Sequence, residues 1–178
     1  DGDDAYRGRV GELVITDIDR PDAICDAFID GVANLGIPRA HDYNGATQEG
    51  VGYFQRTIHK GRRMSAARAF LNPARGRPNL EIRTRANVSR IVFSERRASG
   101  VVYRRGDQTH EVRARREVLL AGGAIASPQI LQVSGIGDPD MLRGINVPVV
   151  HALPGVGENL SDHFGVRLAA RIRNARTL

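Results

Sequence analysis

Ser161, Asp162 and His163 carry the three side-chain types of a hydrolytic triad, and they are consecutive in the sequence. Neighbouring side chains diverge, whereas the groups of a triad converge from distant positions. The trio therefore predicts no hydrolytic site. The other four histidines are widely spaced, with no carboxylate or second histidine three or four residues away on an expected helix. They predict no metal site, because such a site needs converging ligands.

Two glycine pairs look like halves of a dinucleotide-binding fingerprint, Gly135-Ile136-Gly137 and Gly155-Val156-Gly157. A complete fingerprint needs a third glycine three residues further on, between a strand and the helix that faces the pyrophosphate. Asp140 and Leu160 occupy those third positions. Neither pair alone therefore indicates a nucleotide site.

A different glycine pattern follows the run Glu117–Ala121, which is apolar enough for a strand buried on both faces of a parallel sheet. The run ends in Gly122-Gly123, and glycines at the carboxyl end of such a strand let a ligand approach the backbone closely. Tight packing between the strand and the next helix explains the same glycines equally well. The pattern leaves both interpretations open, a nucleotide-binding fold and a structural turn.

The elements that would hold these residues begin with an extended segment over residues 1–18. A helix should follow between Pro21 and Gly36, because apolar residues repeat there at helical spacing: Ile24, Phe28, Val32 and Leu35. Asp19 and Asp22 suit the positive end of this helix. A second, short helix is expected over residues 65–71.

The apolar period then changes to two, which is typical of strands. Four short runs predict an antiparallel meander with a turn at Gly106-Asp107: residues 80–84, 88–93, 100–104 and 109–113. A helix over 127–133 should be capped by Ser127, with Pro128 at its first position. Another helix is expected over 139–144, an extended segment over 147–153, and an alternating segment over 166–172.

The composition predicts a protein with a basic surface, because the net charge is +6 and Lys60 is the one lysine among arginines. The arginines occur as scattered singles and pairs without interleaved aromatic residues, which favours a solvated surface over a nucleic-acid site. No apolar run approaches the roughly 20 residues needed to cross a bilayer, and the start at Asp1 is unlike a signal peptide. With Cys25 as the single cysteine, these features favour a cytoplasmic protein.

Four segments together resemble the glucose–methanol–choline (GMC) oxidoreductases. Residues Gly123 to Gly137 are similar to the second signature of that family in residue type and spacing, and Pro154 to His163 to the loop that follows it. Residues 78–103 are similar to the family's meander. Asp42-Tyr43-Asn44-Gly45, with the following Gln48-Glu49-Gly50, resembles the choline-dehydrogenase-like branch.

The resemblance implies a mixed α/β fold that contains part of an FAD-binding domain of the glutathione-reductase type, with a β-meander, and pieces of an antiparallel-sheet substrate domain. Residues 61–164 would belong to the FAD-binding domain and 1–60 to the substrate domain, to which 165–178 would return. Five residues would lie at the cofactor. The backbone of Val88 would meet the adenine, and the others would lie near the ribose and the cofactor's edge: Ala121, Gly122, Gly123 and Ser127.

The reaction that the resemblance implies is oxidation of a primary, choline-like alcohol by hydride transfer to FAD. The family's catalytic histidine and its glycine fingerprint belong to segments that we do not find in this sequence, so we assign no catalytic residue. We expect an internal fragment that is inactive and lacks FAD by itself. We also expect a small-molecule alcohol as partner, no nucleic acid, and self-association through exposed sheet edges. A non-catalytic α/β binding module is the alternative, followed by a basic nucleic-acid-binding domain.

Overall fold

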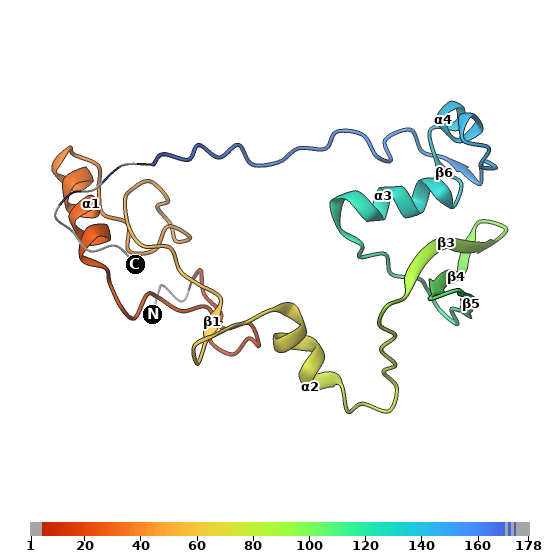
Figure 1. Ribbon diagram of the computed structural model, residues 1–178, viewed down its shortest axis with the longest axis horizontal. Coiled ribbons are helices and arrows are strands. Elements are labelled where there is room, and N and C mark those ends of the chain that lie inside the picture. The colour runs from red at the N-terminus through yellow and green to blue at the C-terminus, as the bar shows by residue number, and fades with distance from the viewer. Residues whose placement is uncertain (1–4, 170, 172, 174–178) are drawn as a thin grey trace. The chain divides into compact units, whose positions relative to one another are not determined.

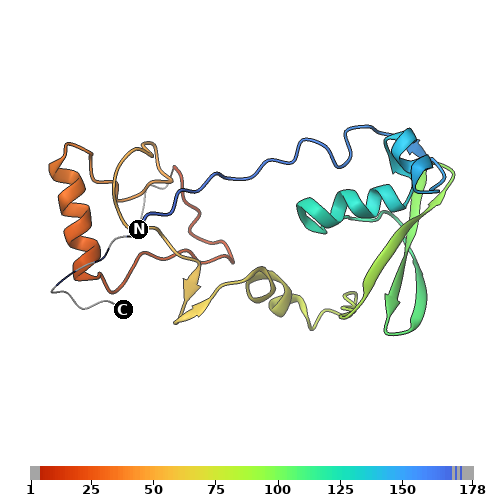
Figure 2. The same cartoon turned by 45° about the horizontal axis from the view of Figure 1, so that its top comes forward.

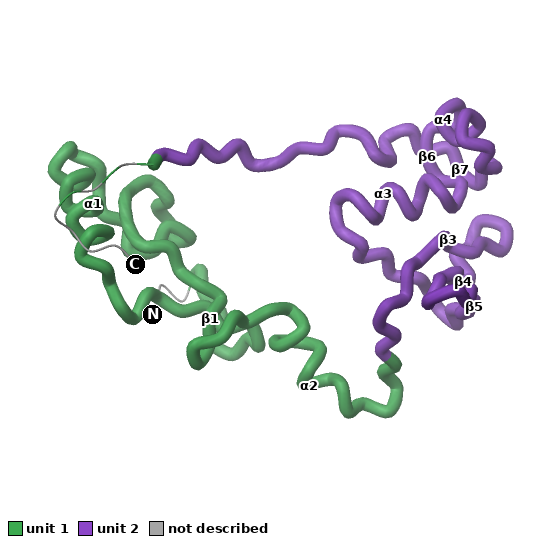
Figure 3. Tube along the Cα trace, in the orientation of Figure 1, with its two compact units in different colours: residues 1–81, 169–178 green, residues 82–168 purple. Residues whose placement is uncertain are grey.

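The computed structural model describes residues 5–169, 171 and 173 (Figure 1, and turned in Figure 2). The described chain divides into two compact units, which Figure 3 shows in different colours. Unit 1 comprises the residues up to 81 together with those from 169 onward, and unit 2 comprises residues 82–168. No helix among the described residues is both long and apolar enough to cross a bilayer.

The helix of unit 1 is α1, Ala23–Asn34, and it begins where the sequence predicts a helix. Asp22 caps it, because one of its carboxylate oxygens accepts hydrogen bonds from the backbone N–H groups of Ile24 at 2.9 Å and Cys25 at 3.4 Å. The expected apolar stripe is not the buried face, however. Ile29 is buried, whereas Phe28 is 66% exposed, because no described segment covers that side of the helix.

The remainder of unit 1 consists mainly of loops joined by short pairings. Thr16 and Arg56 exchange two backbone hydrogen bonds of 2.8 Å, which ties the extended N-terminal segment to the chain ahead of β1. β1 (Ile58–His59) and β2 (Arg62–Arg63) form a two-stranded antiparallel ribbon. The expected helix at 65–71 is a π-helical turn, η1 (Ala67–Leu71), followed by the short helix α2 (Asn72–Ala74).

Unit 2 contains the expected meander. Its strands pair antiparallel in the order β3 (Asn87–Ser94), β4 (Arg97–Arg105) and β5 (Gln108–Arg113). A two-residue turn of Gly106 and Asp107 joins the last two strands, and Gly106 has the left-handed φ of 60° that such turns require. Figure 2 shows these as the long strands of the chain.

The expected strand at 80–84 is absent. Arg83 donates a hydrogen bond of 2.6 Å to the hydroxyl of Tyr103, which holds this segment beside the sheet without strand pairing. The backbone N–H of Ile91, on β3, donates instead to the hydroxyl of Ser134 at 2.8 Å.

The expected buried strand at Glu117–Ala121 is also wrong. These residues form no strand, and Leu119 is 82% exposed. A parallel strand exists only when neighbouring strands supply its hydrogen bonds, and no described segment pairs with this one. The apolar run is therefore present without the sheet that would bury it.

Helix α3 (Gly123–Val133) starts four residues before the expected position. Gly122 precedes its first residue, so Ser127 lies inside the helix instead of capping it, and Pro128 is internal. The helix tolerates Pro128 because the carbonyl that loses its partner belongs to Ala124, which is exposed to water near the helix start.

A compact strand–helix–strand element follows α3. β6 (Ile136–Gly137) pairs in parallel with β7 (His151–Ala152), and α4 (Pro139–Gly144) connects them. The expected helix at 139–144 is thus confirmed, and the expected extended segment at 147–153 contains β7. Leu142 of α4 is fully buried. The alternating segment 166–172 lies partly outside the described residues, and its described part, 166–169, forms no strand.

Candidate functional site

The five residues expected at a cofactor all lie in unit 2, on two different elements. Val88 lies on β3 opposite Tyr103. Of the other four, Ala121 and Gly122 precede α3, Gly123 is its first residue, and Ser127 lies in its second turn. A Cβ added to Gly122 would lie 3.3 Å from the backbone nitrogen of Ser127 and 3.4 Å from its hydroxyl oxygen. The structure therefore brings Gly122 and Ser127 together and leaves Val88 on the sheet.

The first turn of α3 is suited to an anion. Gly123 has a φ of 85°, which only glycine adopts readily, and this turn sends the chain into the helix. No side chain caps the helix and no acidic residue lies in its first turn. The free N–H groups at a helix start, together with the helix dipole, attract negatively charged groups such as phosphate.

A cavity of about 560 Å³ lies between one face of α3 and the loop that follows β7. The helix contributes Ala124, Ile125, Pro128, Gln129 and Gln132, and the loop contributes residues 157–161. Ile125 is 68% exposed and Leu160 is 67% exposed, so the rim of the cavity offers apolar surface. The cavity and the adjoining helix start could hold a ligand that carries both phosphate and apolar groups.

Sequence reasoning missed Gln132 and the part that residues 157–161 play in this cavity. The side-chain amide of Gln132 donates a hydrogen bond of 3.0 Å to the backbone carbonyl of Val156. The signal in the sequence was the pair Gly155-Val156-Gly157, which does not complete a dinucleotide fingerprint but does mark the turn that approaches α3.

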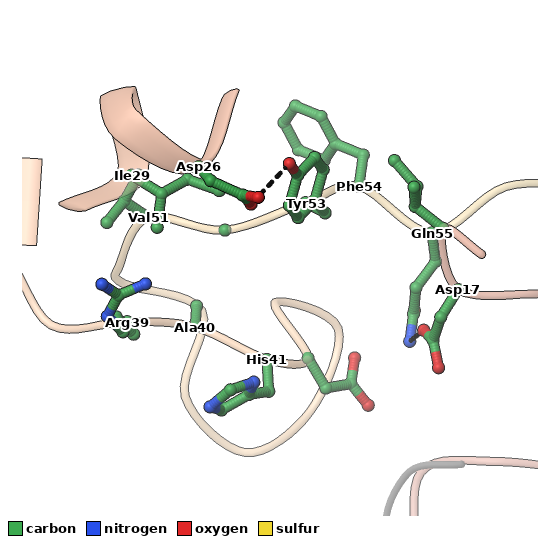
Figure 4. A pocket seen from close by; sticks show the side chains of 13 residues that line it. Asp17, Asp26, Ile29, Arg39, Ala40, His41, Val51, Tyr53, Phe54 and Gln55 are labelled. Carbon is green, nitrogen blue, oxygen red and sulfur yellow. Dashed lines mark hydrogen bonds between the residues drawn. The ribbon is translucent and has the colours of Figure 1, made fainter. Parts of the chain in front are cut away.

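Unit 1 contains a second cavity, of about 450 Å³, between α1 and two loop segments (Figure 4). Its lining combines aromatic, apolar and charged side chains, including three carboxylates: Asp17, Asp26 and Asp42. Gln55 donates to Asp17 at 3.2 Å, and the hydroxyl of Tyr53 donates to Asp26 at 2.8 Å. Both partners are neutral, so neither hydrogen bond places a cation against these carboxylates.

Tyr53 connects this cavity to the start of α1. Its hydroxyl oxygen accepts a hydrogen bond of 3.1 Å from the backbone N–H of Asp22, in addition to donating to Asp26 (Figure 4). Partial burial and the hydrogen bond to the Asp26 carboxylate raise the pKa of Tyr53 above its ordinary value. The phenol therefore stays protonated and acts as a donor.

Residues 41–45 form a turn beside this cavity, and His41 and Asp42 belong to its lining. Asp42 accepts a hydrogen bond of 3.0 Å from the backbone N–H of Asn44 and forms an ion pair with Arg7. The rings of Tyr43 and Phe54 meet edge to face at 4.9 Å. Arg39 also lines the cavity, but it is paired with Asp30, which leaves Asp17, Asp26 and the ring of Phe54 as the groups that attract a small organic cation.

Over the described residues, no group of three His, Cys, Asp or Glu side chains is arranged to hold a metal ion. Cys25 is a free, exposed thiol on α1.

Residues 3–165 match the protein family described as GMC oxidoreductase. Among curated proteins, the chain is 48% identical over 169 residues to an oxygen-dependent choline dehydrogenase of Pectobacterium carotovorum, a match that covers 94% of this chain and 30% of that protein. It is 49% identical over 172 residues to an oxygen-dependent choline dehydrogenase of Stenotrophomonas maltophilia, which covers 94% of this chain and 30% of that one. The chain thus spans about a third of the length of these relatives.

Solved structures show the same relationship. An FAD-dependent oxidoreductase from Chaetomium thermophilum superimposes with a TM-score of 0.85 at 32% identity, over 90% of this chain and 28% of that one. A pyridoxine 4-oxidase from Mesorbium loti superimposes with a TM-score of 0.78 at 35% identity, over 86% of this chain and 30% of that one. The expected fold class, a mixed α/β part of an FAD-binding protein, is confirmed.

Proposed function

Because the chain belongs to the GMC oxidoreductase family, we propose that the whole protein is an FAD-dependent enzyme that oxidises a primary alcohol of the choline type. The observation that carries this proposal is the identity of 48% with an oxygen-dependent choline dehydrogenase over 94% of this chain. The relatives are oxidoreductases, and FAD-dependent proteins are among the structural neighbours. We propose a choline-type alcohol because the similar curated proteins are choline dehydrogenases.

The residues of unit 2 fit a part of FAD. The uncapped start of α3 suits a negatively charged group of the cofactor, and the absence of a side chain at Gly122 leaves the surface beside Ser127 open. The apolar rim at Ile125 and Leu160 suits the non-phosphate part of the cofactor. We therefore assign Val88, Ala121, Gly122, Gly123 and Ser127 to FAD binding, with Val88 at the adenine.

When bound, FAD supplies the hydride acceptor for the oxidation of an alcohol carbon. The part of this chain in that reaction is to hold and orient the cofactor. The N–H groups of the first turn of α3 would neutralise negative charge, while Gly122 and Gly123 would allow the backbone to approach closely. We assign no catalytic residue among the 178 residues.

The cavity of unit 1 supports a positively charged alcohol as substrate. Asp17 and Asp26 line it with neutral hydrogen-bond partners, and Phe54 adds an aromatic ring. These are the groups that attract a quaternary ammonium ion. We accordingly assign residues 1–60, and those from about 165 onward, to the substrate domain, and 61–164 to the FAD-binding domain.

The test uses the whole protein with choline and its neutral isostere, 3,3-dimethylbutan-1-ol. We expect a flavin absorbance band in the purified protein, and we expect choline to bleach it under anaerobic conditions much faster than the isostere does. Absence of flavin would overturn the assignment of the cofactor. Equal bleaching by the two alcohols would overturn the cationic substrate and leave the FAD assignment intact.

A further inference from the structure

One side chain of α3 reaches the loop that forms the far wall of the 560 Å³ cavity. Gln132 donates from its amide to the backbone carbonyl of Val156 at 3.0 Å, across a sequence separation of 24 residues. Val156 lies in a tight turn, in which its own N–H donates to the carbonyl of Leu153 at 3.1 Å. The turn leads directly into the cavity wall at residues 157–161. Gln132 therefore connects α3 to the start of that wall.

Gly157, the next residue of the loop, leaves the space that the amide of Gln132 needs. A Cβ added to Gly157 would lie 2.5 Å from the amide nitrogen of Gln132, which is closer than atoms approach without displacement. The φ of Gly157 is 88°, a conformation that side chains rarely adopt. Glycine at this position thus lets the amide of Gln132 reach the carbonyl of Val156.

The rest of the wall has little other attachment. Residues 157–168 are exposed and form no helix or strand. The N–H of Glu158 bonds within the turn, to Gly155 at 3.3 Å, and the N–H of His163 bonds to the neighbouring Asp162 at 2.7 Å. Both bonds are local, so neither fixes the wall against α3.

We propose that Gln132 is a positioning residue, which sets the distance between the loop 157–161 and the first turns of α3 and thereby shapes the cavity for FAD. The inference rests on the proposed function, because it takes FAD as the ligand of this cavity. It concerns residues that the expected cofactor contacts do not include. Gln132 acts here through the loop that it holds.

The test compares two variants of the whole protein with a matched control. Gln132→Glu keeps the size of the side chain but replaces the donor amide by a carboxylate, and Gly157→Ala displaces the amide from the opposite side. Gln129→Ala is the control, because Gln129 lines the same cavity from the same helix without a hydrogen bond to the loop. Hydrogen exchange of the amides of residues 155–161 is measured on the FAD-free protein, and FAD affinity is measured by quenching of flavin fluorescence.

We expect both variants to exchange these amides faster and to bind FAD more weakly, each by about threefold to tenfold, the effect of one lost hydrogen bond. The control should leave the exchange unchanged. The double variant Gln132→Glu/Gly157→Ala should differ little from Gln132→Glu alone, because both changes break the same hydrogen bond.

Unchanged exchange in both variants would overturn the positioning role, whatever happens to FAD. Faster exchange with unchanged FAD affinity would overturn the link to the cofactor. Lack of FAD binding by the wild-type protein would instead overturn the proposed function, and the exchange measurement would still show whether Gln132 holds the loop. Thermal unfolding of each variant identifies a protein that has lost its fold, in which case the other variant decides.

Discussion

The hydroxyl of Ser134 accepts a hydrogen bond of 2.8 Å from the backbone N–H of Ile91, and so joins the end of α3 to the outer edge of β3. The same hydroxyl donates to the carbonyl of Ile130 one turn earlier. Ser134 is 7% exposed and Ile91 is 6% exposed, so water cannot replace this bond. The contact therefore fixes the helix that carries Ser127 against the strand that carries Val88.

Replacing Ser134 by alanine should leave the N–H of Ile91 buried without an acceptor. Such a group costs about 1–3 kcal/mol. We expect urea unfolding of the whole protein to show a loss of that size for Ser134→Ala. Ser94→Ala, at the exposed end of the same strand, should change stability by less than about 0.5 kcal/mol. Equal effects of the two changes would contradict the role of the Ser134 hydroxyl.

Replacing Gly122 by valine should reduce bound FAD. The new Cβ would crowd Ser127 at 3.3 Å, and the branched methyl groups would fill the surface assigned to the cofactor. Gly144→Val is the control, because a Cβ there meets no atom within 4 Å. The ratio of flavin to folded protein is the measurement. A ratio that is unchanged in Gly122→Val would mean that this glycine serves chain packing alone.

The stability of unit 1 should depend on pH through Tyr53. Its pKa is raised in the folded protein, so the folded state holds the phenol proton more tightly than the unfolded state does. The resulting stabilisation is complete below the ordinary pKa of about 10 and is lost as the pH rises through the folded pKa. We expect wild-type stability to fall more steeply above about pH 10 than that of Tyr53→Phe. Parallel curves would exclude this contribution, and Tyr6→Phe serves as the exposed control.

The 178-residue chain by itself should self-associate. Leu119 is 82% exposed within the unpaired apolar run, and Phe164 is 95% exposed, so the chain presents apolar segments and free sheet edges. Analytical ultracentrifugation should detect dimers or larger species. Leu119→Lys should shift them toward monomer, while Val10→Lys, at a position in unit 1 that is 97% exposed, should not. A wild-type chain that is monomeric at every concentration would contradict the expectation.

The elements that the sequence predicts correctly are those with local causes. The helix after Asp22 follows from a capping residue and a helical period, and the β4–β5 hairpin follows from Gly106, whose left-handed φ needs no distant partner. The strand at Glu117–Ala121 is wrong because an apolar run carries no information about whether another strand lies beside it. The predicted cap at Ser127 is wrong because the helix already begins at Gly123. Ala124 to Ala126 contain no residue that interrupts it.

The residues of the candidate site also differ in whether the sequence can identify them. Gly122 and Gly123 can be selected from sequence, because glycines after an apolar run mark a close approach of the backbone. Gln132 cannot, because its partner lies 24 residues away and is a backbone carbonyl, which every residue possesses. A contact of that kind becomes visible only when the fold brings the two segments together.

The parallel pair of β6 and β7, closed by α4 around the fully buried Leu142, has a consequence for the order of folding. Its contacts join residues that are close in sequence, and such contacts form quickly because little chain entropy is lost in closing the loop. The element between Ile136 and Ala152 can therefore fold while later residues are still leaving the ribosome. The turn at Val156 then meets an α3 whose end is already held to β3 by Ser134. The loop 157–161 therefore folds last, against segments that are already in place.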